Sequence, residues 1–255
     1  MEAESKPTKN TPSIEHDDFS IEKFRFSETF KTLPPTTGKI LEIGFNDLRM
    51  TRLLAERYQE VYGIDLRKLE NQRKNKKNIH LTYASIDHLP FGDETFDLVV
   101  CAQVLEHLPN EVLDRGVKEL ARVSKKWIFV SVPYQQRVWN ELHKCAHCGF
   151  IVNSMAHLHY FDEENLLPLF PGWTVKEARK IGELKGYAPD NLYKLANRWG
   201  NSWSKLHWNC PKCGKKTEEQ QENIFGYLLR RVIWRLENLA PKRKGWILLL
   251  LERDR

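Results

Sequence analysis

Short apolar segments alternate with amphipathic ones over the first half of the chain. Five of these segments are apolar runs of strand length: residues 39–44, 61–65, 79–86, 96–104 and 127–132. The intervening residues 47–57 and 111–124 carry apolar side chains at helical spacing, and each segment is long enough for a crossover helix. Because parallel neighbours in a sheet require such crossovers, the alternation predicts an α/β fold with a parallel sheet.

The pattern is less regular in the second half, although it still predicts several elements. Residues 157–170 are typical of a loop followed by a helix, and residues 173–181 alternate as a strand. An amphipathic helix is predicted over residues 223–238, and a last apolar strand over residues 246–252. The polar stretches between these elements predict inserts into the α/β core.

The N-terminal end has two parts. Residues 1–16 are polar and have little to bury, so we expect a mobile tail, whereas residues 19–30 predict a short covering helix. We therefore divide the chain into a tail with a covering helix (1–37), a cofactor-binding core (38–134), a first insert (135–156), a lid helix with a core strand (157–182), a second insert with a helix (183–245) and a final core strand (246–255).

Composition narrows the class of protein. With 255 residues, 41% of them hydrophobic, the chain has enough apolar material for one sizeable core. Its longest apolar run, residues 246–251, is far shorter than the roughly 20 residues of a membrane-spanning helix, so no span is expected. The N-terminal residues resemble neither an export nor an acylation signal, which predicts a cytoplasmic location. A net charge of +6 favours anionic partners.

The first two predicted strands have the pattern of a nucleotide-binding unit. The first strand runs into Gly44, and the second ends in Asp65, 21 residues further on. In such units backbone N–H groups at the glycine turn meet the ligand, and the acid binds ribose hydroxyls. A dinucleotide-binding dehydrogenase would need Gly-x-Gly-x-x-Gly, but the chain reads Gly-Phe-Asn-Asp-Leu-Arg, which disfavours that class.

Four segments together resemble the class I S-adenosylmethionine-dependent methyltransferase family, in particular its small-molecule branch. They are ILEIGFNDLRMT (40–51), YGID (62–65), ASIDHLPFGDETFDLVVCAQVLEHL (84–108) and the final WILLLLER (246–253). The resemblance implies the Rossmann-like methyltransferase fold, a doubly wound, mostly parallel seven-stranded sheet.

The resemblance also implies which residues contact the cofactor. The Gly44 loop would approach its methionine part, Asp65 would bind the ribose hydroxyls, and Asp87 would face the adenine amino group. The full expected set is Glu42, Gly44, Asn46, Asp65, Leu66, Ile86, Asp87 and Gln103. The family's loop usually reads Gly-x-Gly-x-Gly, and here Asn46 and Leu48 replace the second and third glycines. The bulk of Leu48 would weaken or shift cofactor binding.

Candidate catalytic residues follow the fourth strand, because ligands gather at the carboxyl ends of parallel strands. His107 is the first candidate for a general base, with Glu106 to orient it, and a simple packing role is the alternative. His157, close to His159 before the lid helix, is a candidate for acceptor contact. Some similar quinone-pathway methyltransferases carry Glu-x-x-Glu-His here and bind a divalent metal, but Gln103 replaces the first acid.

Two Cys-x-x-Cys-Gly motifs predict a metal site: Cys145 with Cys148, and Cys210 with Cys213. Two such knuckles supply four thiolates for a tetrahedral zinc ion, and a site closed by four thiolates is structural. The fold would then contain a zinc-binding insertion. Redox pairs or free thiols are the alternatives, and His143 or His147 would be substitute ligands. The fifth cysteine, Cys101, lies in an apolar strand and predicts a core residue.

These features predict an S-adenosylmethionine-dependent methyltransferase with a structural zinc, acting on a small molecule or a glycan, at oxygen rather than nitrogen or carbon. An RNA-modifying enzyme is the first alternative. It would use the basic run at residues 67–77, with Trp199, Trp203 and Trp208 near the second knuckle. The loop after the fourth strand, however, lacks the Asp/Asn-Pro-Pro-Tyr/Phe motif of base-amino methyltransferases. A non-catalytic cofactor-binding scaffold is the second alternative.

Overall fold

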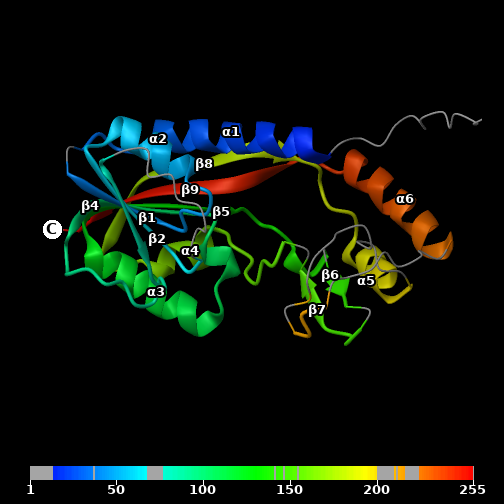
Figure 1. The fold of residues 1–255 in the computed structure, drawn as a ribbon. Helices are drawn as coiled ribbons and strands as arrows, with labels where there is room; N and C mark the ends of the chain where they lie inside the picture. Colours follow the sequence, from blue (N-terminus) through cyan, green and yellow to red (C-terminus); the bar gives the residue numbers. More distant parts are fainter. Residues whose placement is uncertain are drawn as a thin grey trace, which may run out of the picture.

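The protein is built on one seven-stranded sheet (Figure 1). The computed structural model describes residues 14–36, 38–67, 77–140, 142–145, 147–153, 155–199, 210, 212–215 and 224–254. The strands are β1 (Lys39–Ile43), β2 (Glu60–Asp65), β3 (Ile79–Tyr83), β4 (Phe96–Ala102), β5 (Ser124–Pro133), β8 (Trp173–Leu184) and β9 (Arg243–Arg253). Their order is β3-β2-β1-β4-β5-β9-β8, in which the first five are parallel and β9 runs antiparallel to both neighbours. This confirms the predicted doubly wound, mostly parallel sheet.

Both faces of the sheet are covered, as the unbroken apolar strands require. Alternate residues of β4 point to opposite faces, so Leu98 and Val100 belong to one hydrophobic cluster and Val99 and Cys101 to the other. The first cluster is completed by α2 (Arg49–Arg57) and by side chains of α1 (Ile14–Thr32). The second is completed by α3 (Asn110–Val123), α4 (Glu163–Leu166) and the short 3-10 helix η3 (Leu167–Leu169).

Helix α1 is the predicted covering helix, and it lies along β8 and β9 (Figure 1). It begins at Ile14, so the predicted tail is wrong for residues 14–16, and residues 1–13 lie outside the described part. An ion pair between Glu28 and Arg179 of β8 ties the helix to the sheet, and the guanidinium also lies 3.2 Å from the hydroxyl of Thr32. Polar contacts as well as apolar ones therefore fix α1 on the sheet.

A second group of elements lies beyond one end of the sheet (Figure 1). It contains η2 (Val138–Asn140), the hairpin of β6 (Leu142–Lys144) and β7 (Ile151–Asn153), α5 (Asp190–Trp199) and α6 (Ile224–Leu239). We call this group the distal region. Sequence reasoning predicted α6 but interpreted the residues of α5 as part of a polar insert. Helix α5 packs on α6 through Tyr193, Ala196 and Ile233, a small core of its own.

Candidate functional site

The turn after β1 has the backbone shape of a glycine-rich loop although it contains only one glycine. Gly44, Asn46 and Leu48 have φ angles of 77°, 43° and 68°. Two non-glycine residues thus adopt the left-handed conformation that glycines would provide, at a steric cost that Asn bears more easily than Leu. The side chain of Leu48 is buried, and Leu48 begins α2.

Asp65, at the end of β2, is held directly beside this turn. Its carboxylate accepts hydrogen bonds from the backbone N–H of Asn46 at 2.9 Å and of Arg67 at 2.9 Å. The Arg67 guanidinium also donates to the side-chain oxygen of Asn46 at 2.8 Å. Asp65 is nearly buried, whereas the following Leu66 is mostly exposed. The carboxylate is therefore fixed where β1 and β2 end side by side.

Glu42 is a buried acid behind the same turn. Only 3% of the residue is exposed, and its Oε2 has no partner among the described residues. Burial raises the pKa of Glu42 to about 8, and the nearby carboxylates of Asp47 and Asp65 act in the same direction. The site thus holds a carboxylic acid that is neutral at physiological pH unless a cation approaches it.

The predicted adenine-side residues follow β3. Asp87 accepts hydrogen bonds from Arg115 of α3 at 2.8 and 3.1 Å, and from the hydroxyl of Ser85. The hydroxyl of Ser85 and the guanidinium of Arg115 lower the pKa of Asp87. Ile86 is buried against Gly116, where an added Cβ would lie only 3.2 Å from its side chain. Asp87 is thus an anchored, charged carboxylate.

Sequence reasoning missed Arg25, which α1 brings to the carboxyl end of β4. Its guanidinium donates to Oε1 of Gln103 at 2.7 Å and lies 5.3 Å from the ring centre of Trp246. Gln103 in turn donates to the hydroxyl of Ser131 at 2.9 Å and has a φ of 57°. Arg25 and Gln103 are 78 residues apart, and nothing in the local pattern around Arg25 distinguishes it from a surface cation.

Glu106, His107 and His157 meet at the same edge, with ligand atoms all within 4.8 Å of one another. Glu106 is only 1% exposed, and neither carboxylate oxygen has a partner on another described residue. Burial raises its pKa to about 8. The structure thus brings together the three predicted catalytic side chains, two from the short helix η1 (Leu105–His107) and one from the loop before α4.

The hydrogen bonds of the two histidines indicate which ring nitrogens are available. Nδ1 of His157 lies 2.5 Å from Oε1 of Gln136, and Nδ1 of His107 lies 3.3 Å from the carbonyl oxygen of Ala156. Both partners accept only, so each Nδ1 carries the proton and each Nε2 carries a lone pair. Burial lowers the pKa of both, in His157 to about 4. In His159 it is Nε2 that is engaged, 2.6 Å from the carbonyl oxygen of Leu108.

Two imidazoles and a carboxylate are also a donor set that binds divalent cations. The partners of the Nδ1 atoms resemble those that orient metal-bound histidines. The Glu-x-x-Glu-His arrangement would add a further acid at position 103, but Gln103 is occupied by Arg25 and Ser131. The donor set present is therefore Glu106, His107 and His157.

The four cysteines of the two knuckles lie together in the distal region. Sγ of Cys145 is 3.8 Å from that of Cys213, and Sγ of Cys148 is 3.6 Å from that of Cys210. Sulfurs around one zinc ion at bond lengths of about 2.3 Å are separated by about 3.8 Å in a tetrahedron. Backbone N–H groups of Cys148 and His147 lower the pKa of Cys145 to about 6. The geometry therefore fits a four-thiolate metal site.

The two knuckles also have the same backbone. The glycines that follow them, Gly149 and Gly214, both have a φ of 69°, and each N–H donates back to the carbonyl of its first cysteine. His147 is exposed and is not part of the sulfur cluster, while the side chain of His143 lies outside the described residues. Cys101 is fully buried in β4.

The features cited for RNA binding lie mostly outside the described residues. Of the basic run only Arg67 and Lys77 are described, and Arg67 is engaged with Asp65 and Asn46. The side chains of Trp199, Trp203 and Trp208 are likewise outside them. Among the helices that the structure describes, none has the length and apolarity needed to cross a membrane.

Comparison with known sequences finds similarity to methyltransferases. Residues 41–130 match the family described as "Methyltransferase domain". An uncharacterized methyltransferase of Schizosaccharomyces pombe is 27% identical over 179 residues, which cover 65% of this chain and 66% of that protein. An uncharacterized methyltransferase of Staphylococcus carnosus is 27% identical over 115 residues, covering 43% and 54%. The chain thus aligns with two thirds or less of these relatives' length.

Solved structures share the fold at low sequence identity. A chain of the complex between the Haloferax volcanii Trm112 methyltransferase activator and a methyltransferase has a TM-score of 0.56 at 13% identity, covering 95% of this chain and 96% of that one. An S-adenosylmethionine-dependent methyltransferase from Mesorhizobium loti has a TM-score of 0.54 at 12% identity, covering 89% and 96%. Residues 41–130 therefore resemble a methyltransferase domain, and the chain has the Rossmann-like fold of the solved methyltransferases.

The raised pKa of Glu42 predicts a pH-dependent stability. The folded protein holds a proton on Glu42 up to about pH 8, whereas the unfolded chain loses it near pH 4.5. The folded state thus binds more protons across this window, so this group costs stability as pH rises. Glu42→Gln lacks this group, so its free energy of unfolding should fall less than that of the natural protein between about pH 5 and about pH 8. The difference should be at least about 1.4 kcal/mol, the equivalent of one pKa unit.

Urea unfolding at the two pH values measures this difference. Glu111→Gln, a change of an exposed acid on α3, serves as the control and should follow the natural protein at both. If the Glu42→Gln variant also follows the natural protein, Glu42 is ionised throughout and its assignment as a neutral buried acid is wrong.

Proposed function

We propose that this protein transfers a methyl group from S-adenosylmethionine to a hydroxyl group of a small molecule or glycan. The observation that carries the proposal is the position of Glu106, His107 and His157 next to the turn after β1. Val104, which directly precedes the helix η1 of Glu106 and His107, lies so close that a Cβ on Gly44 would come within 2.8 Å of it. A proton acceptor thus adjoins the expected cofactor site.

The residues around the turn fit S-adenosylmethionine. Asp65 would accept hydrogen bonds from the ribose hydroxyls, and Asp87 would accept one from the adenine amino group, with Leu66 and Ile86 beside the ring. Glu42 offers a buried carboxyl oxygen without a partner, which suits a ligand that carries an ammonium and a sulfonium group. Gly44, Asn46 and Gln103 would border its methionine part. When bound, the cofactor supplies an electrophilic methyl group.

His107 would remove the proton of the acceptor hydroxyl. Its Nδ1 faces a carbonyl, so Nε2 presents a lone pair, and the ring reaches the surface where an acceptor enters. His157 is more deeply buried and, with a pKa near 4, is a weaker base, which suits it to orient the acceptor. The ionised form of Glu106 would stabilise a protonated His107, because a neighbouring cation favours the charged carboxylate.

The knuckles would hold one structural zinc ion per chain. The four thiols close a tetrahedron and leave no position for a substrate, so the ion would join the β6–β7 hairpin to the segment around Cys210 and Cys213. These two segments are more than 60 residues apart in sequence. The metal would therefore organise the distal region rather than take part in methyl transfer.

The first test concerns the cofactor. The unchanged protein should bind S-adenosylmethionine, and Asp65→Asn should weaken binding by about tenfold to a hundredfold, since a charge-assisted hydrogen bond contributes about 1.5–3 kcal/mol. Isothermal titration calorimetry measures both, with the exposed Asp114→Asn of α3 as a control of unchanged affinity. Absence of binding by the unchanged protein would refute the catalytic proposal and favour a scaffold.

A second test concerns the base. His107→Ala should lower kcat about a hundredfold or more and leave the affinity for S-adenosylmethionine within about twofold, because a general base acts in the transition state. Labelled cofactor with a panel of nucleotide sugars, glycans, phenols and RNA identifies the acceptor first. His80→Ala, which removes an exposed histidine of β3, should retain full activity. Unchanged kcat in His107→Ala would exclude this residue as the base.

A third test concerns the metal. Purified protein should contain one zinc ion per chain, and Cys210→Ser should lose it and expose the distal region to proteolysis, because metal binding and folding of such segments are coupled. Elemental analysis gives the stoichiometry. Cys101→Ala changes a cysteine outside the knuckles and should keep the zinc ion. Full zinc content in Cys210→Ser would contradict the four-thiolate site.

A further inference from the structure

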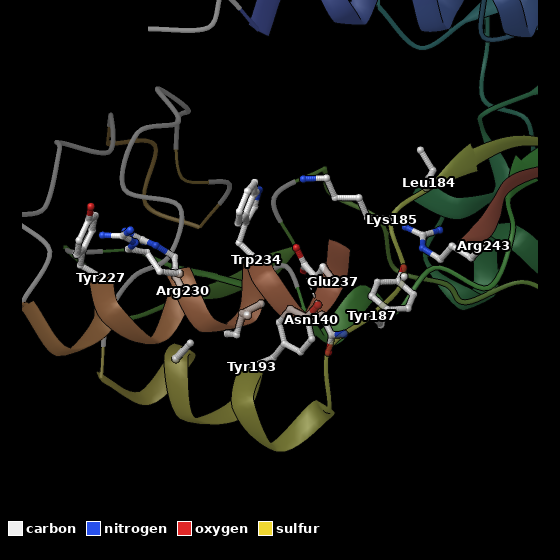
Figure 2. Close-up of a pocket in the computed structure, with 14 residues that line it drawn as sticks. Asn140, Leu184, Lys185, Tyr187, Tyr193, Tyr227, Arg230, Trp234, Glu237 and Arg243 are labelled. Carbon is white, nitrogen blue, oxygen red and sulfur yellow. Dashed lines mark hydrogen bonds between the residues drawn. The ribbon is translucent and has the colours of Figure 1, made fainter. Parts of the chain in front are cut away.

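A cavity of about 730 Å³ lies in the distal region, between α5, α6 and the adjoining ends of β8 and β9 (Figure 2). None of the residues proposed for cofactor binding, base catalysis or zinc binding lines it. It is therefore a separate cavity.

The charge of the cavity lining favours an anion. Lys185, Arg230, Arg231 and Arg243 contribute four cations, and among the described lining residues Glu237 is the single acid. The Glu237 carboxylate is already bound to the hydroxyl of Tyr193, at 2.5 Å. Among the lining residues that the structure describes, cationic side chains therefore outnumber acidic ones.

Three of these cations rest on aromatic rings. Nζ of Lys185 lies 5.0 Å from the ring centre of Trp234, and Cζ of Arg243 lies 4.3 Å from that of Tyr187. Cζ of Arg231 lies 5.9 Å from the ring centre of Tyr227. A ring contacts the face of a guanidinium and leaves its N–H edges available, so these contacts position the cations without neutralising them.

Helix α6 presents these groups on one side. Its aromatic and charged lining residues are Tyr227, Arg230, Arg231, Trp234 and Glu237. Tyr227, Arg230, Trp234 and Glu237, labelled along the helix in Figure 2, recur every three or four residues. Ile233, which packs towards α5, also lines the cavity, as do Tyr193 and Ala196 of α5. The aromatic and basic residues are thus gathered on the cavity side by helical spacing.

One buried polar group in the lining has no partner. Asn140 is 3% exposed, and neither its amide nitrogen nor its oxygen has a hydrogen-bond partner in the described part of the chain. Figure 2 labels it among the lining residues, together with Tyr193 and Glu237. An unpaired buried carboxamide is costly, and its adjacent donor and acceptor match those on the edge of a nucleobase.

We propose that this cavity binds a nucleoside diphosphate group. The base stacks on the tyrosine and tryptophan rings and pairs with Asn140 once it displaces the side chains that cover the two amide atoms. The diphosphate is bound by Lys185 and Arg231. Stacking on aromatic side chains with cations along a phosphate chain is a general mode of nucleotide recognition. The group is either a free nucleotide or the carrier part of a nucleotide sugar.

The experiment titrates the full-length protein with UDP, ADP, GDP and CDP by calorimetry, without S-adenosylmethionine. At least one should bind with a Kd below about 100 µM. Lys185→Ala and Arg231→Ala should each weaken that binding about tenfold, the effect of one lost charge-assisted contact. Arg235→Ala is the matched control, because this exposed arginine of α6 is not in the lining, and it should bind as the unchanged protein does.

Further ligands test the role of the base and the source of the group. Inorganic pyrophosphate and geranyl diphosphate should bind at least about tenfold more weakly than the best nucleotide, since neither carries a base. The nucleotide that binds best is then compared with its own nucleotide sugar. If the nucleotide sugar binds more tightly, the cavity binds the nucleotide part of a nucleotide sugar; if the nucleoside diphosphate binds more tightly, the cavity binds a free nucleotide.

Three results would overturn the proposal. The first is that none of the four nucleotides binds. The second is that geranyl diphosphate binds as tightly as the best nucleotide. The third is that an RNA oligonucleotide binds, that its affinity falls in Lys185→Ala, and that the nucleotides do not displace it. Asn140→Asp, which keeps the shape but exchanges the donor for an acceptor, should also change the preference among the four bases. Because none of these measurements involves the methyl donor, they are independent of the proposed methyl transfer.

Discussion

The five parallel strands end at the same edge of the sheet, and this shared direction is the constraint on which the proposed active site depends. It places the turn after β1, the acid after β2 and the histidine loop after β4 side by side, although they are far apart in sequence. The hydrogen bond from Asn46 to Asp65 joins the first two, and the close packing of Val104 on Gly44 joins the first to the third. A displacement of one strand end would therefore move all three.

The distal region is connected to this edge by a short segment after β5. Gln136 binds His157, the backbone N–H of Arg137 donates to the hydroxyl of Tyr187 at 3.1 Å, and Asn140 borders the cavity of the distal region. Asn153 of β7 donates to the carbonyl of Val138 at 2.8 Å, which fixes the segment against the hairpin. Gln136 and Asn140, in one short segment, thus contact the histidine site and the cavity respectively.

The sheet could be predicted from the sequence, because apolar strands separated by amphipathic helices pack as a parallel sheet covered on both faces. The knuckles could be predicted because Cys-x-x-Cys-Gly is a local motif that forms its own turn. The sequence also predicted that Asn46 and Leu48 occupy glycine positions, but not that both adopt positive φ. Helix α5 was missed because it packs on α6 and η2 rather than on the sheet, so the strand and crossover pattern does not include it. Arg25 and Asn140 were missed because their surroundings arise from contacts between distant segments, which no local pattern records.

Two buried acids, Glu42 and Glu106, lie near this one edge, and burial raises the pKa of each to about 8. Each has a carboxylate oxygen without a partner in the described part of the chain, which is costly in the absence of a ligand. Such acids are neutral near pH 7, yet a cation brought close to either would favour its charged form. Arg25 already lowers the pKa of Glu106 in part, and protonation of His107 would do the same. The proposed sulfonium donor and the proposed general base would each bring positive charge to this edge, and either charge would favour the ionised form of the nearby acid.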